Sequence, residues 1–154
     1  MARINPTAPL RRAGALAVAA GSLFTVAGVG AWCTITKQLR DEKITVPGNA
    51  PAFAGKRVQD PASAYVQALV IKGNAERGAG GRTFADISSA LRGLDPQSDE
   101  AKELHAHSAS LSTAASLRTS LMTSVLAYGV SALAAGLGGL LMLMGTQLRR
   151  DRRN

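Results

Sequence analysis

Two histidines, His105 and His107, carry the side chains best suited to bind a metal ion or exchange a proton near neutral pH. On a helix, residues two positions apart point roughly 200° away from each other, so both could not bind one ion. Glu103 shares a helix face with His107, but two ligands fall short of the three or four that a metal site needs. The spacing therefore predicts solvated helix residues, no metal site and no cofactor, with a weak pH response as the alternative.

The other groups of reactive side chains also lack the pattern of a known chemistry. Residues 78–83 are rich in glycine but lack the Gly-Lys-Ser/Thr ending of a phosphate-binding loop, so we expect a flexible turn. Cys33 is the single cysteine, which excludes an internal disulfide. We expect it to be a buried small hydrophobe, with an intermolecular disulfide as the alternative. No Ser-His-Asp, Cys-His or paired-carboxylate arrangement is evident, and we predict no catalytic residue.

Two long uncharged stretches must form the structural elements that position any functional residues of this chain. Residues 119–148 form a run of thirty residues and residues 13–36 a run of twenty-four, and neither run holds a charged side chain. A helix rises about 1.5 Å per residue, so both runs are long enough to cross a hydrocarbon core of roughly 30 Å. We predict a mainly α fold: a two-helix transmembrane hairpin, with residues 37–118 as a small, mostly helical extracytoplasmic loop domain.

The basic residues that flank these stretches predict the orientation of the chain. Residues 1–12 and 149–154 hold seven arginines against one acid, Asp151, which is a net charge of +6. Basic residues gather on the cytoplasmic side of membrane spans, and two crossings place both ends on that side. We predict a multi-pass protein of the plasma membrane with a cytoplasmic tail at each end. The residues expected at the membrane interfaces are Arg11, Arg12, Trp32, Arg149, Arg150, Arg152 and Arg153.

A cleaved secretory signal is the alternative interpretation of the first stretch. Arginines precede the apolar run, and the small residues at 29–31 could mark a cleavage site. The run is longer than the roughly 7–15 apolar residues of a usual signal core, which favours retention as a membrane span.

The formal net charge of +8 does not indicate a nucleic-acid-binding protein. Residues 37–118 hold eleven Lys and Arg against nine Asp and Glu, so most of the excess charge lies at the two ends. Aromatic side chains, which form stacking platforms for bases, make up only 4% of the chain. The charge distribution favours a lipid bilayer with anionic cytoplasmic headgroups as the partner and excludes nucleic acid.

Local signals within residues 37–118 predict a short hairpin and two helices. Residues 37–43 should continue the first helix for a turn. Residues 44–46 and 57–58 could form two short strands that flank a turn at 47–49 and the segment 50–56. Asp60-Pro61 and Asp95-Pro96 each predict a helix start. The first helix should end by residues 78–81, and the second should run on into the 119–148 stretch. The residues expected to form a small core are Phe53, Phe84, Ile87, Leu91 and Leu94.

Small residues recur every seven positions in both uncharged stretches. They let two helix backbones approach closely, and close packing, rather than hydrophobicity, drives helix association in lipid. We therefore predict that the hairpin packs along these positions, with Ala132/Gly136 and Ala135/Gly139 as further small pairs. The alternative is that frequent Gly and Ala produce the period by chance. The predicted packing positions are Gly14, Gly21, Gly28, Ser124, Ser131, Gly138 and Gly145.

Several short motifs resemble a group of small two-span actinobacterial membrane proteins that are often labelled aromatic ring-opening dioxygenase. The motifs are residues 42–46 (EKITV), 60–64 (DPASA), 80–85 (GGRTFA), 118–121 (RTSL) and 125–130 (VLAYGV). The resemblance implies the two-span topology and a setting in the cell envelope. The label implies a metal-dependent oxygenase, and an extradiol enzyme of that kind holds Fe(II) with two histidines and a carboxylate.

The sequence favours a non-enzymatic function. A loop domain of this size can bury little core by itself, and the chain offers small-residue stripes for packing but no catalytic groups. We predict an accessory or scaffold subunit that packs against other membrane proteins of the cell envelope or against copies of itself. The alternatives are the dioxygenase activity implied by the resemblance and an extracytoplasmic sensor that binds a small ligand.

Overall fold

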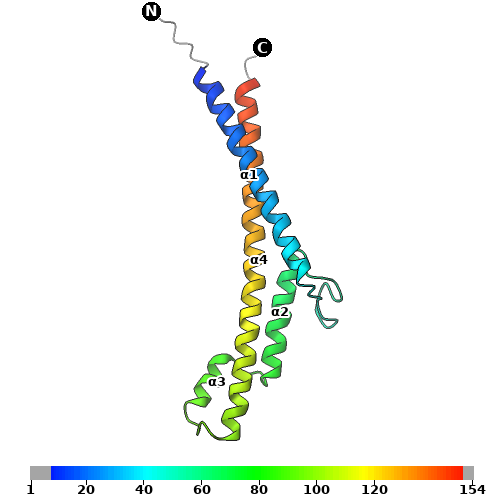
Figure 1. The fold of residues 1–154 in the computed structure, drawn as a ribbon, viewed down its shortest axis with the longest axis vertical. Coiled ribbons are helices and arrows are strands. Elements are labelled where there is room, and N and C mark those ends of the chain that lie inside the picture. The colour runs from blue at the N-terminus through cyan, green and yellow to red at the C-terminus, as the bar shows by residue number, and fades with distance from the viewer. Residues whose placement is uncertain (1–7, 151–154) are drawn as a thin grey trace, which may run out of the picture. The chain divides into compact units, whose positions relative to one another are not determined.

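The computed structural model describes residues 8–150 and is mainly helical, as predicted. Figure 1 shows its four helices, α1 (Ala8–Asp41), α2 (Pro61–Gly78), α3 (Phe84–Leu91) and α4 (Asp99–Arg150). No strand occurs within these described residues. Arg152 and Arg153, which we expected at a membrane interface, lie outside the described part of the chain.

The described residues divide into two compact units, one comprising residues 8–36 and 126–150 and the other residues 37–125. The helix α4 contributes to both. Helices α1 and α4 are each long and apolar enough to cross a membrane, which fits a membrane protein. The first helix begins at Ala8 and so includes residues 8–12, which we had assigned to a cytoplasmic tail. It ends at Asp41, so the predicted extra turn beyond residue 36 is confirmed.

The start of α2 follows the predicted signal at Asp60-Pro61. The Asp60 carboxylate accepts hydrogen bonds from the backbone N–H groups of Ala62 (3.0 Å) and Ser63 (2.9 Å). The Ser63 hydroxyl lies 3.3 Å from the Asp60 backbone nitrogen and accepts from it, which completes a capping box. Pro61 occupies the first helical turn, where its missing N–H costs nothing.

The glycine-rich segment after α2 ends this helix. The N–H of Gly81 donates to the carbonyl of Glu76 (2.8 Å) and the N–H of Gly80 to the carbonyl of Arg77 (3.1 Å), which is the Schellman pattern of helix termination. Gly80 has φ +65°, a conformation that residues with a Cβ rarely adopt. Residues 78–83 therefore form an ordered helix cap, more defined than the flexible turn that we expected.

Helix α3 was not predicted, although the sequence carries its signal. The Thr83 hydroxyl accepts from the backbone N–H of Asp86 (3.3 Å), and the Asp86 carboxylate accepts from the N–H of Thr83 (2.8 Å). This is a capping box formed by a threonine and an aspartate three residues later. The Thr83 hydroxyl also donates to the Asp86 carboxylate (2.7 Å). This bond and the one from the Thr83 N–H stabilise the ionised carboxylate and hold the pKa of Asp86 below its usual value.

The predicted helix start at Asp95-Pro96 is wrong by three residues. The Asp95 carboxylate accepts from the N–H of Gln97 (2.9 Å) and forms a turn before the helix. The Ser98 hydroxyl then accepts from the N–H of Ala101 (3.1 Å), so Ser98 caps a helix that begins at Asp99. The helix then continues without interruption to Arg150, as expected of a helix that runs on into the second uncharged stretch.

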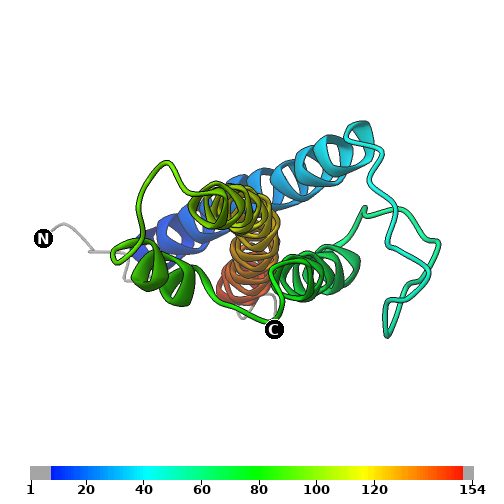
Figure 2. The same ribbon diagram turned by 90° about the horizontal axis from the view of Figure 1, so that it is seen from below.

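Helices α2 and α3 lie on two sides of the first part of α4 within the unit of residues 37–125 (Figures 1 and 2). A core cluster forms there from Ala79, Ile87, Leu104 and Leu111, and Leu91 and Leu94 pack against it. Three predicted core residues thus lie in or against this cluster, namely Ile87, Leu91 and Leu94. The expectation for Phe84 is wrong because its side chain is 53% exposed and faces a hollow lined by the small residues Ala114 and Ala115.

The predicted pair of strands is reduced to one isolated bridge between Thr45 and Arg57. The N–H of Val46 donates to the Lys56 carbonyl and the N–H of Val58 to the Ile44 carbonyl, each at 2.9 Å. Val46 and Val58 are fully buried. The pairing is therefore present at the predicted positions but is too short to count as a strand.

Candidate functional site: a glycine-lined helix pair

The small residues of the two uncharged stretches are the buried positions of α1 and α4. Gly14, Gly21 and Gly28 are buried in α1 although most neighbouring apolar side chains of this helix are exposed. Ser131, Gly138 and Gly145 are buried in α4 in the same way. A seven-residue spacing keeps positions on one side of a helix, so each helix presents one narrow face of small residues to the other.

The backbones meet at three places along this face. A Cβ atom placed on Gly21 would lie 2.5 Å from the carbonyl oxygen of Gly138, and one on Gly28 would lie 2.5 Å from that of Ser131. One on Gly14 would lie 2.9 Å from the carbonyl oxygen of Gly145. Positions rise along α1 as their partners fall along α4, so the segments are antiparallel. The close approach requires glycine because real Cβ atoms essentially never come within 3.0 Å of another atom.

Other predicted packing positions do not contribute to this contact. Gly136 and Gly139 have no neighbouring atom within 4 Å of a placed Cβ, so they do not act as small pairs with Ala132 and Ala135 within the described chain. Ser124 belongs to the other unit, where its hydroxyl donates to the Ser120 carbonyl at 3.2 Å.

An aromatic pair joins the two helices beyond the last glycine contact. The rings of Trp32 and Tyr128 meet edge to face, with centroids 4.6 Å apart and planes at 66°. The Tyr128 hydroxyl shares a hydrogen bond of 2.8 Å with the hydroxyl of Thr36. Tyr128 is 1% exposed, and a tyrosine in an apolar run needs a partner for its hydroxyl, a signal that the sequence analysis missed. Trp32, expected only as an interface residue, also contributes to helix packing.

Three more hydroxyl groups in this unit donate to backbone carbonyls of their own helix. The Thr25 hydroxyl donates to the Gly21 carbonyl (2.9 Å), and that of Ser131 to the Ala127 carbonyl (2.7 Å). The Ser22 hydroxyl donates to the Val18 carbonyl (2.9 Å) and lies 3.4 Å from the sulfur of Met142 on the opposite helix. Such bonds to carbonyls one turn earlier make polar side chains compatible with a lipid environment.

Arginines from both helices meet at one end of this unit. Arg11, Arg12 and Arg149 line a hollow of about 330 Å³ together with Ala15. Arg150 is exposed and does not line it. These four side chains were expected at a membrane interface, but nothing in the sequence indicated that three of them share one hollow.

Cys33 is exposed, so the expectation that it is buried is wrong. The buried face of α1 passes through Gly28, and Cys33 lies five residues further on. Five residues turn a helix by roughly 140° relative to a complete number of turns, which points Cys33 away from α4.

The histidines do not come together in the structure. His107 is half-buried and lines a hollow of about 320 Å³ with Glu100, Glu103 and Arg82, whereas His105 is exposed and lies outside it. Among residues 8–150, no three His, Cys, Asp or Glu side chains group closely enough to hold a metal ion. These residues therefore do not fit the two-histidine, one-carboxylate Fe(II) site that the dioxygenase label implies.

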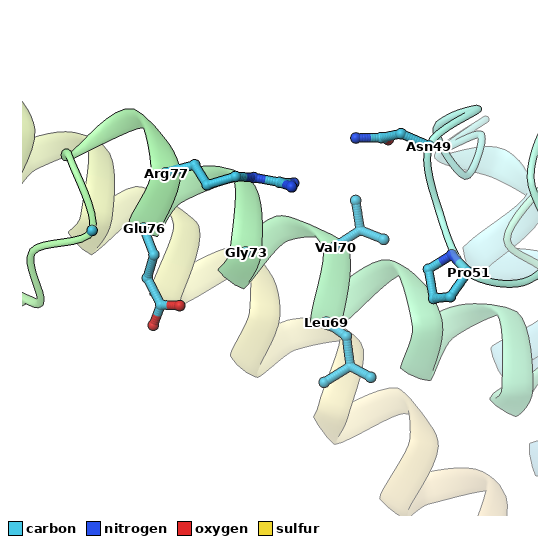
Figure 3. A pocket seen from close by; sticks show the side chains of 8 residues that line it. Asn49, Pro51, Leu69, Val70, Gly73, Glu76 and Arg77 are labelled. Carbon is cyan, nitrogen blue, oxygen red and sulfur yellow. The ribbon is translucent and has the colours of Figure 1, made fainter.

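A larger hollow of about 530 Å³ lies between α2 and the segment that precedes it. Figure 3 shows the side chains of Asn49 and Arg77 extending into the same space, with Val70 and Pro51 beside it. Arg77 is held by the Asn74 side chain at 2.5 Å. The hollow brings an amide and a guanidinium together but no pair of groups arranged for acid-base or nucleophilic chemistry.

Comparison of the chain with protein-family models, with curated proteins and with solved structures gave no match in any of the three searches.

Proposed function

We propose that this chain is a two-span membrane protein that acts as an accessory or scaffold subunit. In this proposal α1 and the second part of α4 form a transmembrane hairpin with cytoplasmic ends. Residues 37–118 form a helical domain outside the cytoplasm, and the outer faces of the two helices contact other membrane proteins.

The observation that carries the proposal is the contrast between the two faces of each helix. The inner faces make backbone contact through glycine, yet only 11% of the most apolar window of α1 and 17% of that of α4 are buried. Exposed apolar surface of this extent is unfavourable in water, whereas in a bilayer it is covered by lipid or by another helix. These low buried shares support a helix pair that presents its outer apolar faces to lipid or to partners.

Site-specific photocrosslinking in native membranes tests the scaffold function. A photoreactive residue at Leu133 (62% exposed) or Leu140 (58% exposed) faces outward from α4. We expect a discrete protein adduct, either a partner with its own membrane span or a second copy. The matched control is the same residue at Met142, which faces α1 and should give only intrachain products. Lipid adducts alone at both outward positions would contradict the scaffold function.

Topology is tested separately with the single thiol. Cys33→Ser with Phe84→Cys moves this thiol to an exposed position of the 37–118 domain, outside the bilayer, so a membrane-impermeant maleimide should label it in intact cells. Labelling only after the membrane is broken would reverse the proposed orientation.

A further inference from the structure

The hollow lined by Arg11, Arg12 and Arg149 lies where the glycine packing of the helix pair ends. A Cβ placed on Gly14 would lie 3.1 Å from the Cγ atom of Arg149. The aliphatic part of the Arg149 side chain therefore packs against α1 at Gly14, where there is no side chain in its way. The close contact of Gly14 with Gly145 therefore places Arg149 of α4 at the same hollow as Arg11 and Arg12 of α1.

Within the described residues of the helix pair, no acidic side chain balances the positive charge of this hollow. Residues 8–36 and 126–150 contain four arginines and no Asp or Glu. The three ion pairs between described side chains all lie within residues 37–125. Like charges in one hollow repel each other, so the arrangement favours a bound anion.

Helix dipoles explain the positions of the arginines in α4 but not the positions of those in α1. Arg149 and Arg150 lie in the last turn of α4, where a cation is favourable. Arg11 and Arg12 lie near the start of α1, where the helix carries partial positive charge and a cation is unfavourable. An anion between the two helix ends would offset this repulsion, and guanidinium groups bind phosphate oxygens in pairs.

The surroundings of the hollow are apolar. Arg12 directly precedes the first uncharged stretch, and Arg149 directly follows the second. Leu16 (71% exposed) and Met144 (63% exposed) lie one turn or more towards the middle of these stretches. A ligand that fits both features has an anionic head and hydrocarbon chains.

We propose that Arg11, Arg12 and Arg149 bind the phosphate of an anionic phospholipid in the cytoplasmic leaflet, with the acyl chains along the exposed apolar side chains of α1 and α4. This inference rests on the membrane insertion proposed above. The site differs from general attraction to an anionic surface because it depends on one hollow rather than on the number of charges near the membrane.

Native mass spectrometry of the full chain tests the proposal, with phosphatidylglycerol and phosphatidylcholine of identical acyl chains as probes. We expect one phosphatidylglycerol to bind in preference to phosphatidylcholine. Arg12→Gln and Arg149→Gln should each weaken this preference about tenfold, the effect of losing one hydrogen bond between charged groups. Arg149→Lys should recover part of it because the charge is kept but the paired hydrogen bonds are lost.

Two controls separate the hollow from the overall charge. Arg150→Gln removes the same charge one residue away and should change the preference less than twofold, because Arg150 does not line the hollow. Ala15→Leu keeps every charge but fills the hollow, and it should weaken binding as much as an arginine substitution. Equal effects of Arg150→Gln and Arg149→Gln, or full binding by Ala15→Leu, would overturn the proposal.

Inorganic phosphate and an extraction assay distinguish the remaining outcomes. Displacement of the lipid by millimolar phosphate would show a site for a soluble anion and overturn the lipid assignment. A chain that resists alkaline extraction from membranes but shows no lipid preference would contradict the lipid site and leave the proposed membrane insertion intact. A chain released by alkaline extraction would sink the proposed membrane insertion and this inference with it.

Discussion

Replacing Gly21 by alanine should separate the two helices. The new Cβ would lie 2.5 Å from the Gly138 carbonyl oxygen and 2.8 Å from the Met142 nitrogen, and ordinary contact begins at 3.4 Å. Both neighbours are backbone atoms, so no side-chain rotation can relieve the clash. The helices must move apart by about 0.9 Å at this point, from 2.5 Å to 3.4 Å.

The cost of this movement follows from the short range of packing forces. A gap of about 0.5–1 Å removes a quarter to a half of the dispersion attraction between surfaces. Inserting one methyl group into a packed interface typically costs about 1–3 kcal/mol. The equilibrium between packed and separated helices should therefore shift by roughly 5- to 150-fold.

Disulfide formation between the helices measures this shift. The Ser22 hydroxyl and the Met142 sulfur are 3.4 Å apart, so Ser22→Cys with Met142→Cys in a Cys33→Ser background places two thiols at facing positions of the two helices. The effective concentration of the two thiols in membranes, measured in a glutathione buffer, should fall roughly 5- to 150-fold when Gly21→Ala is added. Gly30→Ala is the matched control, because a Cβ there has no neighbour within 4 Å. Equal effective concentrations for Gly21→Ala and Gly30→Ala would refute the packing argument.

Three further predictions concern single contacts outside the glycine pairs. Tyr128→Phe keeps the aromatic pair but removes the 2.8 Å hydrogen bond to Thr36, so it should lower the free energy of unfolding in detergent by about 1 kcal/mol. A double-mutant cycle with Thr36→Val that shows no coupling between the two positions would contradict this prediction. Gly80→Ala should destabilise the fold by about 1 kcal/mol because φ is +65°, whereas Gly78→Ala, within α2 and with open space, should be neutral or stabilising in thermal denaturation. Because the folded pKa of Asp86 is lowered, its contribution to stability is complete above its ordinary pKa of 3.8 and is lost as the pH falls through the lower folded value. The protection factors of the α3 amides, which correct for the intrinsic pH dependence of exchange, should therefore fall in this acidic range. Asp86→Asn should abolish that fall, and protection factors that stay constant in the unmodified chain would refute the prediction.

Local structure was the part of the fold that the sequence predicted best. The helix that starts at Asp60-Pro61 and the end near Gly78–Gly81 depend on residues within one turn of each other, so short-range rules suffice. The same rules could have found α3 from Thr83 and Asp86. They failed at Asp95-Pro96 because an aspartate before a proline can also form a turn, and Ser98 competes successfully as the cap.

The candidate site could be predicted in part from the sequence and in part only from the tertiary structure. The seven-residue spacing of small residues indicated which side of each helix could pack, because this spacing depends only on helix geometry. Contacts such as Trp32 with Tyr128, over ninety residues apart in the chain, depend on how the two helices are aligned. The exposure of Cys33 likewise depends on which side of α1 meets α4.

By itself, the sequence determined that the chain has two helices able to cross a membrane, since charge and length decide this residue by residue. It also determined the charge at the two ends. Only the tertiary structure decided the register that sets Gly14 against Gly145, Gly21 against Gly138 and Gly28 against Ser131. That register brings Arg149 beside Arg11 and Arg12, because the alignment of two helices is a property of their joint packing and not of either segment alone.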